Sequence, residues 1–219
     1  MKDRMSVPAT SAPPARSTYR HGDLRRALLA AGVELARAGG PEAVVLREAT
    51  RRAGVVPNAA YRHFESRQAL LQAVRAAALS AVARAMEAEL ATLQPMRDPA
   101  AFARATVRAV GAGYLRFAQS ETGLFRTAFA TQVDVQGQPE KAMSGDSGLD
   151  PFQLLGAALD RLVEAGAMPA ARRPGAEFLA WSAVHGLAML VIDGPLRDMP
   201  RAQVDALGQR LLDMVEKGL

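Results

Sequence analysis

The stretch LREATRRAGVVPNAAYRHF, from Leu46 to Phe64, has the pattern of two short helices joined by a tight turn. The first helix is expected to end near Ala53, because Gly54 follows where a helix C-terminus favours a left-handed residue. A second helix is expected to begin at Pro57, since the fixed φ of proline suits the first helical position and its missing N–H is not needed there. The stretch therefore predicts a helix-turn-helix.

The second of these helices has one apolar side and one small, polar side. Ala60 and Phe64 lie four residues apart and are expected to face inward, whereas Asn58, Ala59 and Arg62 lie on the other side. In the major groove of DNA, Asn can pair with N6 and N7 of adenine, and Arg with O6 and N7 of guanine. The alternative is a surface helix whose Asn and Arg are only solvated. We interpret the polar side as a DNA-reading surface.

Residues 19 to about 71 resemble the tetracycline-repressor (TetR) family of transcriptional regulators. The segments that carry the resemblance are, in chain order, Tyr19-Arg20-His21-Gly22-Asp23-Leu24, Leu46-Arg47-Glu48, Arg52-Ala53-Gly54-Val55, Tyr61-Arg62-His63-Phe64 and Ser66-Arg67-Gln68-Ala69-Leu70. The chain departs from the family pattern at Val45 and Val56, where residues that cap a helix with a hydroxyl group are common. Each missing cap is expected to cost about 1 kcal/mol of helix stability.

Geometry and the resemblance together divide the expected DNA contacts into two kinds. Asn58 and Arg62 are assigned to base edges. Arg47 and Arg67 open neighbouring helices, whose N-terminal N–H groups favour phosphate, and are assigned to the DNA backbone. The resemblance implies that Tyr61 and His63 contact the backbone too. The expected DNA-binding set is Arg47, Asn58, Ala59, Tyr61, Arg62, His63 and Arg67.

Composition indicates an all-α globular protein, because Ala is abundant, aromatic content is low and β-branched runs are short. The chain has 219 residues and no cysteine, which excludes disulfides and thiolate metal sites. No secretory signal is recognisable, so a cytoplasmic protein is expected. The apolar run from Phe178 to Ile192 is too short to span a membrane. No cofactor or metal motif and no catalytic set is found around the three histidines.

Charge divides the chain into two unequal parts. Residues 1–75 hold 13 Lys and Arg against 6 Asp and Glu, whereas residues 76–219 hold 14 against 16. The basic excess therefore coincides with the helix-turn-helix, which favours a phosphate footprint over an ordinary solvated face. We expect a disordered arm at 1–18, a three-helix DNA-binding domain at 19–66 and a helical effector-binding and dimerisation domain at 67–219. Arg16 and Arg20 could enter the minor groove, or the arm could be only a solvated tail.

Helical periodicity continues through most of the second part. Helices are expected over about 23–38, 66–93, 99–119, 121–131, 150–165, 175–193 and 201–217, and a mobile loop over 133–148. The last two helices carry apolar stripes, with Trp181 and His185 on one and Leu207 and Leu211 on the other. Such a pair is typical of half of an intermolecular four-helix bundle, and the resemblance implies dimerisation through it. The alternative is an internal core.

A group of aromatic and Met residues in the second part suits a mostly apolar pocket. Its members are Tyr114, Phe117, Phe125, Phe129, Trp181, His185 and Met189, and all except Phe129 form the candidate ligand-binding set. His185 alone could equally be a satisfied core residue. Few charged residues accompany these stripes, so an apolar or amphipathic effector is expected.

These observations predict a homodimeric transcriptional regulator without enzymatic activity. The resemblance implies a repressor that binds a pseudo-palindromic operator in double-stranded DNA and is released by a small-molecule effector. One alternative is an architectural or co-regulatory DNA-binding protein without an effector. A more remote alternative is a helical enzyme or adaptor.

Overall fold

The protein is described by a computed structural model that places residues 21–130 and 141–218. Within these residues the chain forms α-helices, three short 3-10 helices and no strand. The α-helices are α1 (His21–Gly39), α2 (Leu46–Arg52), α3 (Pro57–Ala60), α4 (Arg67–Leu90), α5 (Pro99–Ser120), α6 (Thr122–Ala128), α7 (Pro151–Glu164), α8 (Ala176–Ile192) and α9 (Arg201–Gly218). The all-α prediction is therefore confirmed. The expected disordered arm at 1–18 lies outside the described residues.

The starts of several helices follow from local capping chemistry. Ser66 caps α4, as expected, because its hydroxyl oxygen accepts a hydrogen bond from the Ala69 N–H at 3.1 Å. Asp150 caps α7 in a reciprocal capping box with Gln153, in which each side chain bonds the other residue's backbone N–H. A proline occupies the first turn of α3, α5 and α7, where its missing N–H leaves no partner unsatisfied.

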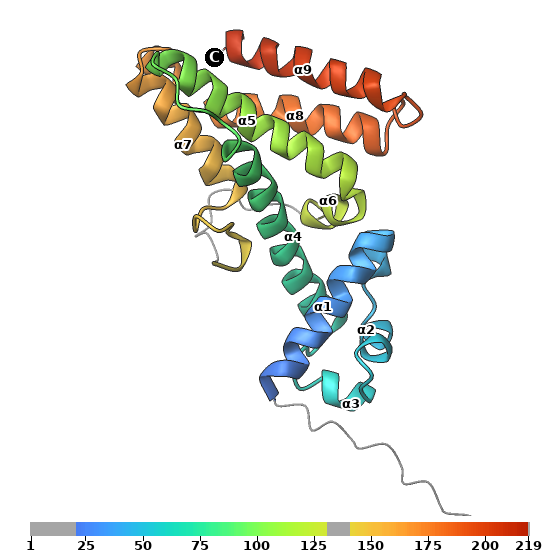
Figure 1. The fold of residues 1–219 in the computed structure, drawn as a ribbon. Helices are drawn as coiled ribbons and strands as arrows, with labels where there is room; N and C mark the ends of the chain where they lie inside the picture. Colours follow the sequence, from blue (N-terminus) through green and yellow to red (C-terminus); the bar gives the residue numbers. More distant parts are fainter. Residues whose placement is uncertain (1–20, 131–140, 219) are drawn as a thin grey trace, which may run out of the picture.

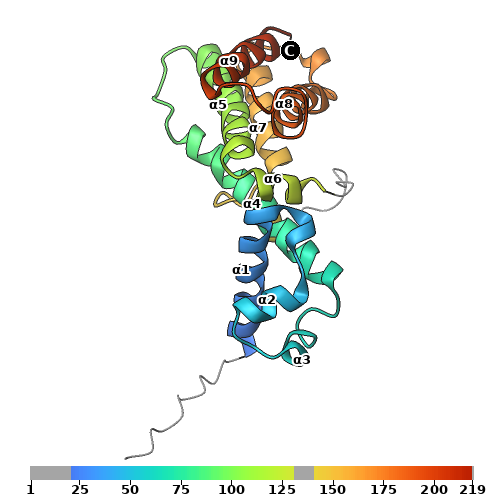
Figure 2. The same cartoon turned by 90° about the vertical axis from the view of Figure 1, so that its right-hand side faces the viewer.

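The molecule is elongated, with the helix-turn-helix at one end (Figures 1 and 2). Helices α1, α2 and α3 form that end, whereas α5, α7, α8 and α9 pack together at the other. Helix α4 runs from the first group into the second, and the short α6 lies beside it, where the two groups meet. The boundaries assigned to the DNA-binding and effector-binding domains stay predictions.

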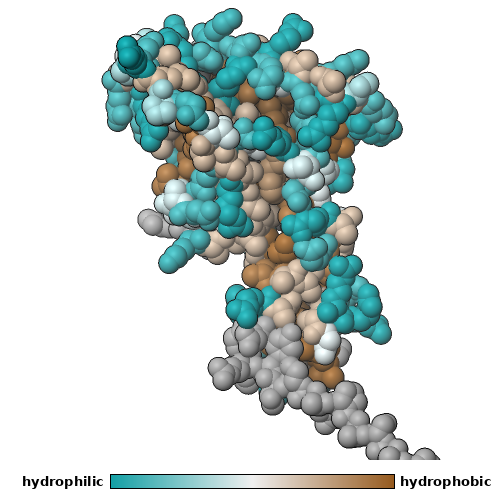
Figure 3. Space-filling model, viewed as in Figure 1, coloured by the Kyte–Doolittle hydropathy of each residue, from teal (hydrophilic) through white to brown (hydrophobic). Residues whose placement is uncertain are grey.

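One continuous hydrophobic core joins the two ends. It runs from Leu28 on α1 through Val74 and Val82 on α4 to Leu159 on α7, and all four side chains are completely buried. Helix α4 is long and apolar enough to cross a membrane by composition, but 61% of its most apolar window is buried inside the protein. Its hydropathy is that of a central core helix. On the face shown in Figure 3, hydrophilic residues cover much of the C-terminal helices and hydrophobic ones show along the narrower middle.

The expected mobile loop at 133–148 requires a correction in its second half. Residues 131–140 lie outside the described part, but residues 141–149 form a 3-10 helix and a turn with defined contacts. The Glu87 carboxylate on α4 accepts hydrogen bonds from the backbone N–H groups of Asp146 and Ser147 at 2.8 and 2.9 Å. Burial alone would raise the pKa of Glu87, but the bonds from Ser147 and Asp146 outweigh it and hold that pKa below its usual value. The Gly, Ser and Asp content indicated flexibility, and this distant carboxylate fixes the turn.

Candidate functional site

The turn between α2 and α3 is fixed by backbone geometry. Gly54 has a φ of 67°, in the left-handed region that glycine adopts without steric cost. The next N–H, of Val55, donates to the Thr50 carbonyl at 3.0 Å, which closes the end of α2. The Thr50 side chain is buried, and its hydroxyl donates to the Arg47 carbonyl at 2.7 Å. The predicted helix end at Ala53 and Gly54 is confirmed.

Helix α3 presents the polar side that the sequence predicts, although it is shorter than expected. Ala60 is completely buried and Phe64 is 2% exposed, whereas Asn58 and Arg62 are exposed and Ala59 is half-buried. The α-helix ends at Ala60, and Tyr61–His63 form a hydrogen-bonded turn in which the His63 N–H donates to the Ala60 carbonyl at 2.9 Å. Arg62 therefore extends from the turn and not from a regular helix. Tyr61 is exposed and His63 is half-buried beside it.

The arginine side chains of the helix-turn-helix end differ in whether they already bond other residues of the protein. On α2, the Glu48 carboxylate accepts hydrogen bonds from Arg51 at 2.9 and 2.7 Å and a longer one from Arg52 at 3.4 Å. The hydrogen bonds from Arg51 lower the pKa of Glu48 to about 2, so Glu48 stays charged at neutral pH. The side chains of Arg47 and Arg62 are exposed and make no hydrogen bond or ion pair within residues 21–130 and 141–218. These two cations are available for an external anion.

Arg67, which was predicted to contact phosphate, is bonded within the protein. Its Nε donates to the Val44 carbonyl at 2.8 Å, and its Nη2 donates to the Pro41 carbonyl at 2.8 Å. The same Nη2 lies 3.4 Å from Glu42, in the 3-10 helix that precedes α2. The guanidinium thus joins the start of α4 to the segment that leads into α2. A phosphate contact through its remaining N–H groups stays a prediction.

A second feature gathers four of the predicted ligand-binding residues in the C-terminal part. Tyr114 on α5, Phe125 on α6, and Trp181 and His185 on α8 come together with Phe129 at the end of α6. The His185 ring lies between 5.1 and 6.4 Å from the centroids of the other four rings. We call these five residues the aromatic cluster.

Phe152 and Phe178, which are not in the candidate ligand-binding set, extend the aromatic cluster. Two residues of that set, Phe117 and Met189, lie outside the cluster. Phe152 on α7 contacts Trp181 and the half-exposed Phe178, so the row of rings reaches the surface. Phe117 is buried on α5 without a ring contact to the cluster in the described part, and Met189 is 37% exposed on α8. A helical stripe gives the face of a residue but not its partner on another helix, so Phe152 could not have been placed from sequence.

Hydrogen bonds within the aromatic cluster define the state of His185. The Trp181 indole N–H donates to the Tyr114 hydroxyl oxygen at 3.2 Å, and that oxygen lies 2.8 Å from Nδ1 of His185. The Tyr114 side chain is buried and its own O–H needs an acceptor, which assigns the Nδ1 lone pair to it and the ring proton to Nε2. Burial lowers the pKa of His185 and raises that of Tyr114, so both are neutral near pH 7. His185 is thus an uncharged, half-buried ring that carries its N–H on Nε2.

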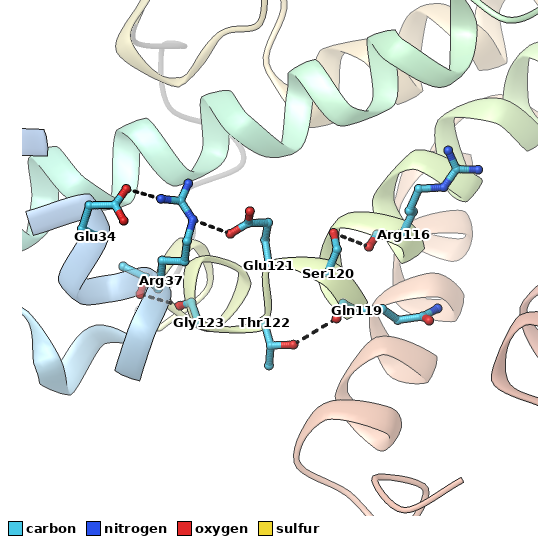
Figure 4. Close-up of polar contacts among 9 residues, drawn as sticks. Glu34, Arg37, Arg116, Gln119, Ser120, Glu121, Thr122 and Gly123 are labelled. Atoms are coloured by element: carbon cyan, nitrogen blue, oxygen red, sulfur yellow. Dashed lines mark hydrogen bonds and ion pairs between the residues drawn. The ribbon is translucent and has the colours of Figure 1, made fainter. Parts of the chain in front are cut away.

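Helix α6 carries Phe125 of the aromatic cluster and also contacts α1. The Glu121 carboxylate, just before α6, accepts a hydrogen bond from Arg37 Nε of α1 at 2.8 Å, and Arg37 also pairs with Glu34 (Figure 4). Gly123 packs so closely against α1 that an added Cβ would collide with the carbonyl oxygens of Ala36 and Arg37. Helices α6 and α1 are therefore in direct backbone contact.

Helix α8 has an exposed apolar face opposite the aromatic cluster. Leu179 is 67% exposed and Leu190 is 44% exposed, and Ser182 and Gly186 lie between them at helical spacing. A Cβ at Gly186 would meet no atom within 4 Å, so the helix surface is open there. The stripe of Trp181 and His185, which was assigned to an intermolecular bundle, faces the protein's own core instead. Leu207 and Leu211 of α9 are likewise half-buried against that core.

The bonds of Arg67 lead to the first prediction. Arg67→Lys and Arg67→Ala should each lower the free energy of unfolding by about 1–2 kcal/mol, because lysine cannot reproduce the two-pronged bond to the Val44 and Pro41 carbonyls. Urea unfolding measures this free energy. Arg51→Lys is the matched control, since Arg51 bonds only Glu48 on its own helix, and it should change stability by less than about 0.5 kcal/mol. Stability of Arg67→Lys equal to that of the unchanged protein would show that these bonds do not hold α4 to the segment before α2.

Two family models match the chain in its two parts. Residues 28–74 match the model described as bacterial regulatory proteins of the tetR family, and residues 107–215 match that of the tetracyclin repressor-like C-terminal domain. No protein with a curated function matches the chain.

Solved structures show the same fold along most of the chain. A protein of unknown function from Rhodococcus sp. RHA1 is 26% identical, with a TM-score of 0.71 over 93% of this chain and 99% of that one. A TetR variant from Acinetobacter baumannii AYE, in complex with minocycline, is 20% identical, with a TM-score of 0.55 over 87% and 93%. The TetR family regulator PfmR from Thermus thermophilus is also 20% identical, with a TM-score of 0.53 over 88% and 98%. The last two likenesses concern the fold alone. The two family matches, together with the helix-turn-helix and the all-helical fold, show that this chain belongs to the TetR family of transcriptional regulators.

Proposed function

We propose that the protein is a dimeric repressor that binds a pseudo-palindromic operator and releases it when a small molecule binds the aromatic cluster. In this proposal residues 19–66 bind DNA, residues 67–219 bind the effector and dimerise, and the protein acts in the cytoplasm. The observation that carries the proposal is the surface at α3. There Asn58 and Arg62 are exposed around the small Ala59, and Arg62 has no partner within the described part of the chain.

The division of DNA contacts follows from what each side chain already bonds. Asn58 and Arg62 read base edges, because an amide and a guanidinium match the major-groove edges of adenine and guanine. Arg47 opens α2 and contacts phosphate, helped by Tyr61 and His63 from the turn after α3. Arg67 contributes mainly by holding α4 to the segment before α2 through the Val44 and Pro41 carbonyls. It thereby fixes the angle at which the reading surface is presented.

Dimerisation through α8 supplies the two-fold symmetry that a palindrome requires. The face formed by Leu179, Ser182, Gly186 and Leu190 is apolar, exposed and without bulk at its centre. Glycine in the middle of a helix costs about 0.5–1 kcal/mol relative to alanine, and here it would allow a second helix to approach closely. In the proposed operator complex, the two copies of α3 in this dimer lie in successive major grooves about 34–36 Å apart.

The aromatic cluster is the proposed effector site because it combines aromatic rings with one hydrogen-bond donor, and because α6 links it to α1 at the helix-turn-helix end. Aromatic walls and the N–H of His185 suit an apolar or amphipathic molecule with one hydrogen-bond acceptor. Phe125 lies on α6 and Phe129 directly follows it, and the start of α6 contacts Arg37 and the α1 backbone. A ligand that displaces these rings would move α6 and α4 and thereby shift the dimer towards a spacing that does not fit the operator.

The second prediction tests base reading. Arg62→Ala should cost about 1–3 kcal/mol of binding free energy on an operator obtained by selection from random duplexes, and should relax preference at one base pair in each half-site. Fluorescence anisotropy on operator and on random DNA at matched salt measures both effects. Arg84→Ala is the control, because Arg84 lies on α4 beyond the helix-turn-helix and bonds Ser80. Equal losses on the two DNAs for Arg62→Ala would show that Arg62 does not read sequence.

The third prediction tests the dimer. Leu190→Arg should convert a dimer at micromolar concentration into a folded monomer and should abolish binding to the two-half-site operator, because a charge would be buried in the interface. Analytical ultracentrifugation gives the mass, and circular dichroism checks the fold. Met96→Arg is a matched control, since Met96 is 46% exposed in the α4–α5 connection, away from α8. A Leu190→Arg protein that remains a dimer would place the interface elsewhere.

The fourth prediction concerns the effector. The chain has one tryptophan, Trp181, so a ligand of the aromatic cluster should change the protein's intrinsic fluorescence. A thermal-shift screen over hydrophobic metabolites and drugs should find a stabiliser that changes this fluorescence and releases the operator. His185→Phe should weaken its binding about tenfold, since it keeps a ring but removes the donor.

Met96→Leu should leave the affinity for that ligand unchanged. A stabiliser that leaves Trp181 fluorescence unchanged and binds the His185→Phe protein normally would show that the effector site lies elsewhere. If no screened compound releases DNA, the result favours the alternative of a DNA-binding protein without an effector.

A further inference from the structure

Val56 is the most exposed large hydrophobic residue in the described part of the chain, with 69% of its surface accessible. It precedes α3 at the N-cap position, in an extended conformation with φ −72° and ψ 143°, and it makes no side-chain cap. The side chain therefore contributes neither to the core nor to capping. Single exposed apolar residues are normal on protein surfaces, so exposure alone assigns no role. Its position on the reading surface supplies the second observation.

The backbone around Val56 is held by hydrogen bonds on both sides. Val55 is held by the hydrogen bond from its N–H to the Thr50 carbonyl, and the Val56 carbonyl accepts one from the Ala59 N–H at 3.0 Å. Val56 therefore has a fixed backbone position at the start of the same short helix that carries the exposed Asn58. In a helix-turn-helix, the residues at the N-terminus of the second helix are those that contact base edges.

The chemistry of valine leaves one suitable partner at a base edge. Valine has two methyl groups and no hydrogen-bonding atom, so it gains nothing from the donors and acceptors of the groove or from phosphate. The C5-methyl group of thymine is the apolar feature that the major groove presents, and it distinguishes T·A from the other base pairs. A β-branched side chain is also stiff at χ1, so its methyl groups keep a defined position.

We propose that Val56 is a specificity-determining residue that contacts the C5-methyl of one thymine in each operator half-site. The inference rests on the proposed operator binding and adds an apolar contact to the polar readout by Asn58 and Arg62. Burying one methyl group against another apolar group corresponds to about a fourfold change in affinity per half-site. The contact would select thymine over cytosine at a position where no protein hydrogen bond does so.

Replacing thymine by deoxyuridine tests the contact, because uracil lacks the methyl group and keeps the same base pairing. The full-length protein is first used to select an operator from random duplexes, and each conserved thymine is then replaced symmetrically in both half-sites. At one thymine position the unchanged protein should lose about fourfold per half-site, or about 15-fold for the symmetric duplex. The Val56→Ala protein should bind the thymine and uracil duplexes equally.

Two further variants separate reading from folding. Val56→Ser introduces a hydroxyl that can cap α3, so it should be at least as stable as the unchanged protein and should still lose the preference for thymine over uracil. Val45→Ala changes the other exposed valine at an N-cap, that of α2, and should keep the full preference.

The possible outcomes distinguish this inference from the proposed function. If uracil costs the Val56→Ala and unchanged proteins equally, the methyl group is read by another residue and the inference is wrong. If the unchanged protein binds every uracil operator as well as the thymine operator, the inference is wrong while operator reading by Arg62 stands. If no operator can be selected, both the inference and the proposed function are wrong.

Discussion

The structure depends on the burial of α4 against helices at both ends of the molecule. Its first half packs on α1, and its second half packs on α5 so closely that a Cβ at Gly113 would collide with the backbone of Met86. Side chains that interdigitate at this density do not slide gradually, because a small displacement loses many contacts at once. Contacts of this kind join the helix-turn-helix and the C-terminal helices through α4, which the proposed mechanism uses to transmit a movement from one to the other.

Helix α6 adds a second connection, and its contacts are of a different kind from those of α4. It bears ion pairs at its two ends, with Arg37 and Glu121 joining it to α1, and Arg126 and Asp193 joining it to the end of α8. These pairs are partly exposed, so each contributes little to stability by itself. They do, however, set the direction in which α6 can move, because Gly123 leaves no space between α6 and the α1 backbone. Weak ion pairs at both ends of α6 and a close backbone contact at Gly123 are compatible with a small, directed movement of this helix.

Local chemistry made much of the fold and of the reading surface predictable from sequence. The left-handed Gly54, the cap at Ser66 and the buried Phe64 each follow from a residue type and its immediate neighbours. The bonds of Arg67 were not predictable, because the carbonyls that it reaches are 23 and 26 residues away. The same reason explains the turn held by Glu87 and the ring contact between Phe152 and Trp181. Periodicity also assigned the wrong face of α8 to an interface, since both faces are apolar and only packing shows which one α5 and α6 cover.

In the aromatic cluster, Trp181, Tyr114 and His185 are uncharged and linked by hydrogen bonds. This arrangement suits the proposed action of an uncharged ligand on the arginines assigned to DNA. Tyr114 accepts from Trp181 and bonds His185, so these three side chains from α5 and α8 hold one another in place without any charge. A ligand that accepts a hydrogen bond from the His185 N–H does not have to displace a charged group. Its binding free energy would therefore come from contacts with the aromatic rings, and no ion pair would have to break. Because Phe125 belongs to α6, a ligand that shifts its ring would also shift α6 relative to α1. In the proposed mechanism, this movement would change the spacing of the arginines assigned to DNA in the two subunits without changing their own contacts, so the ligand would act on operator affinity through geometry.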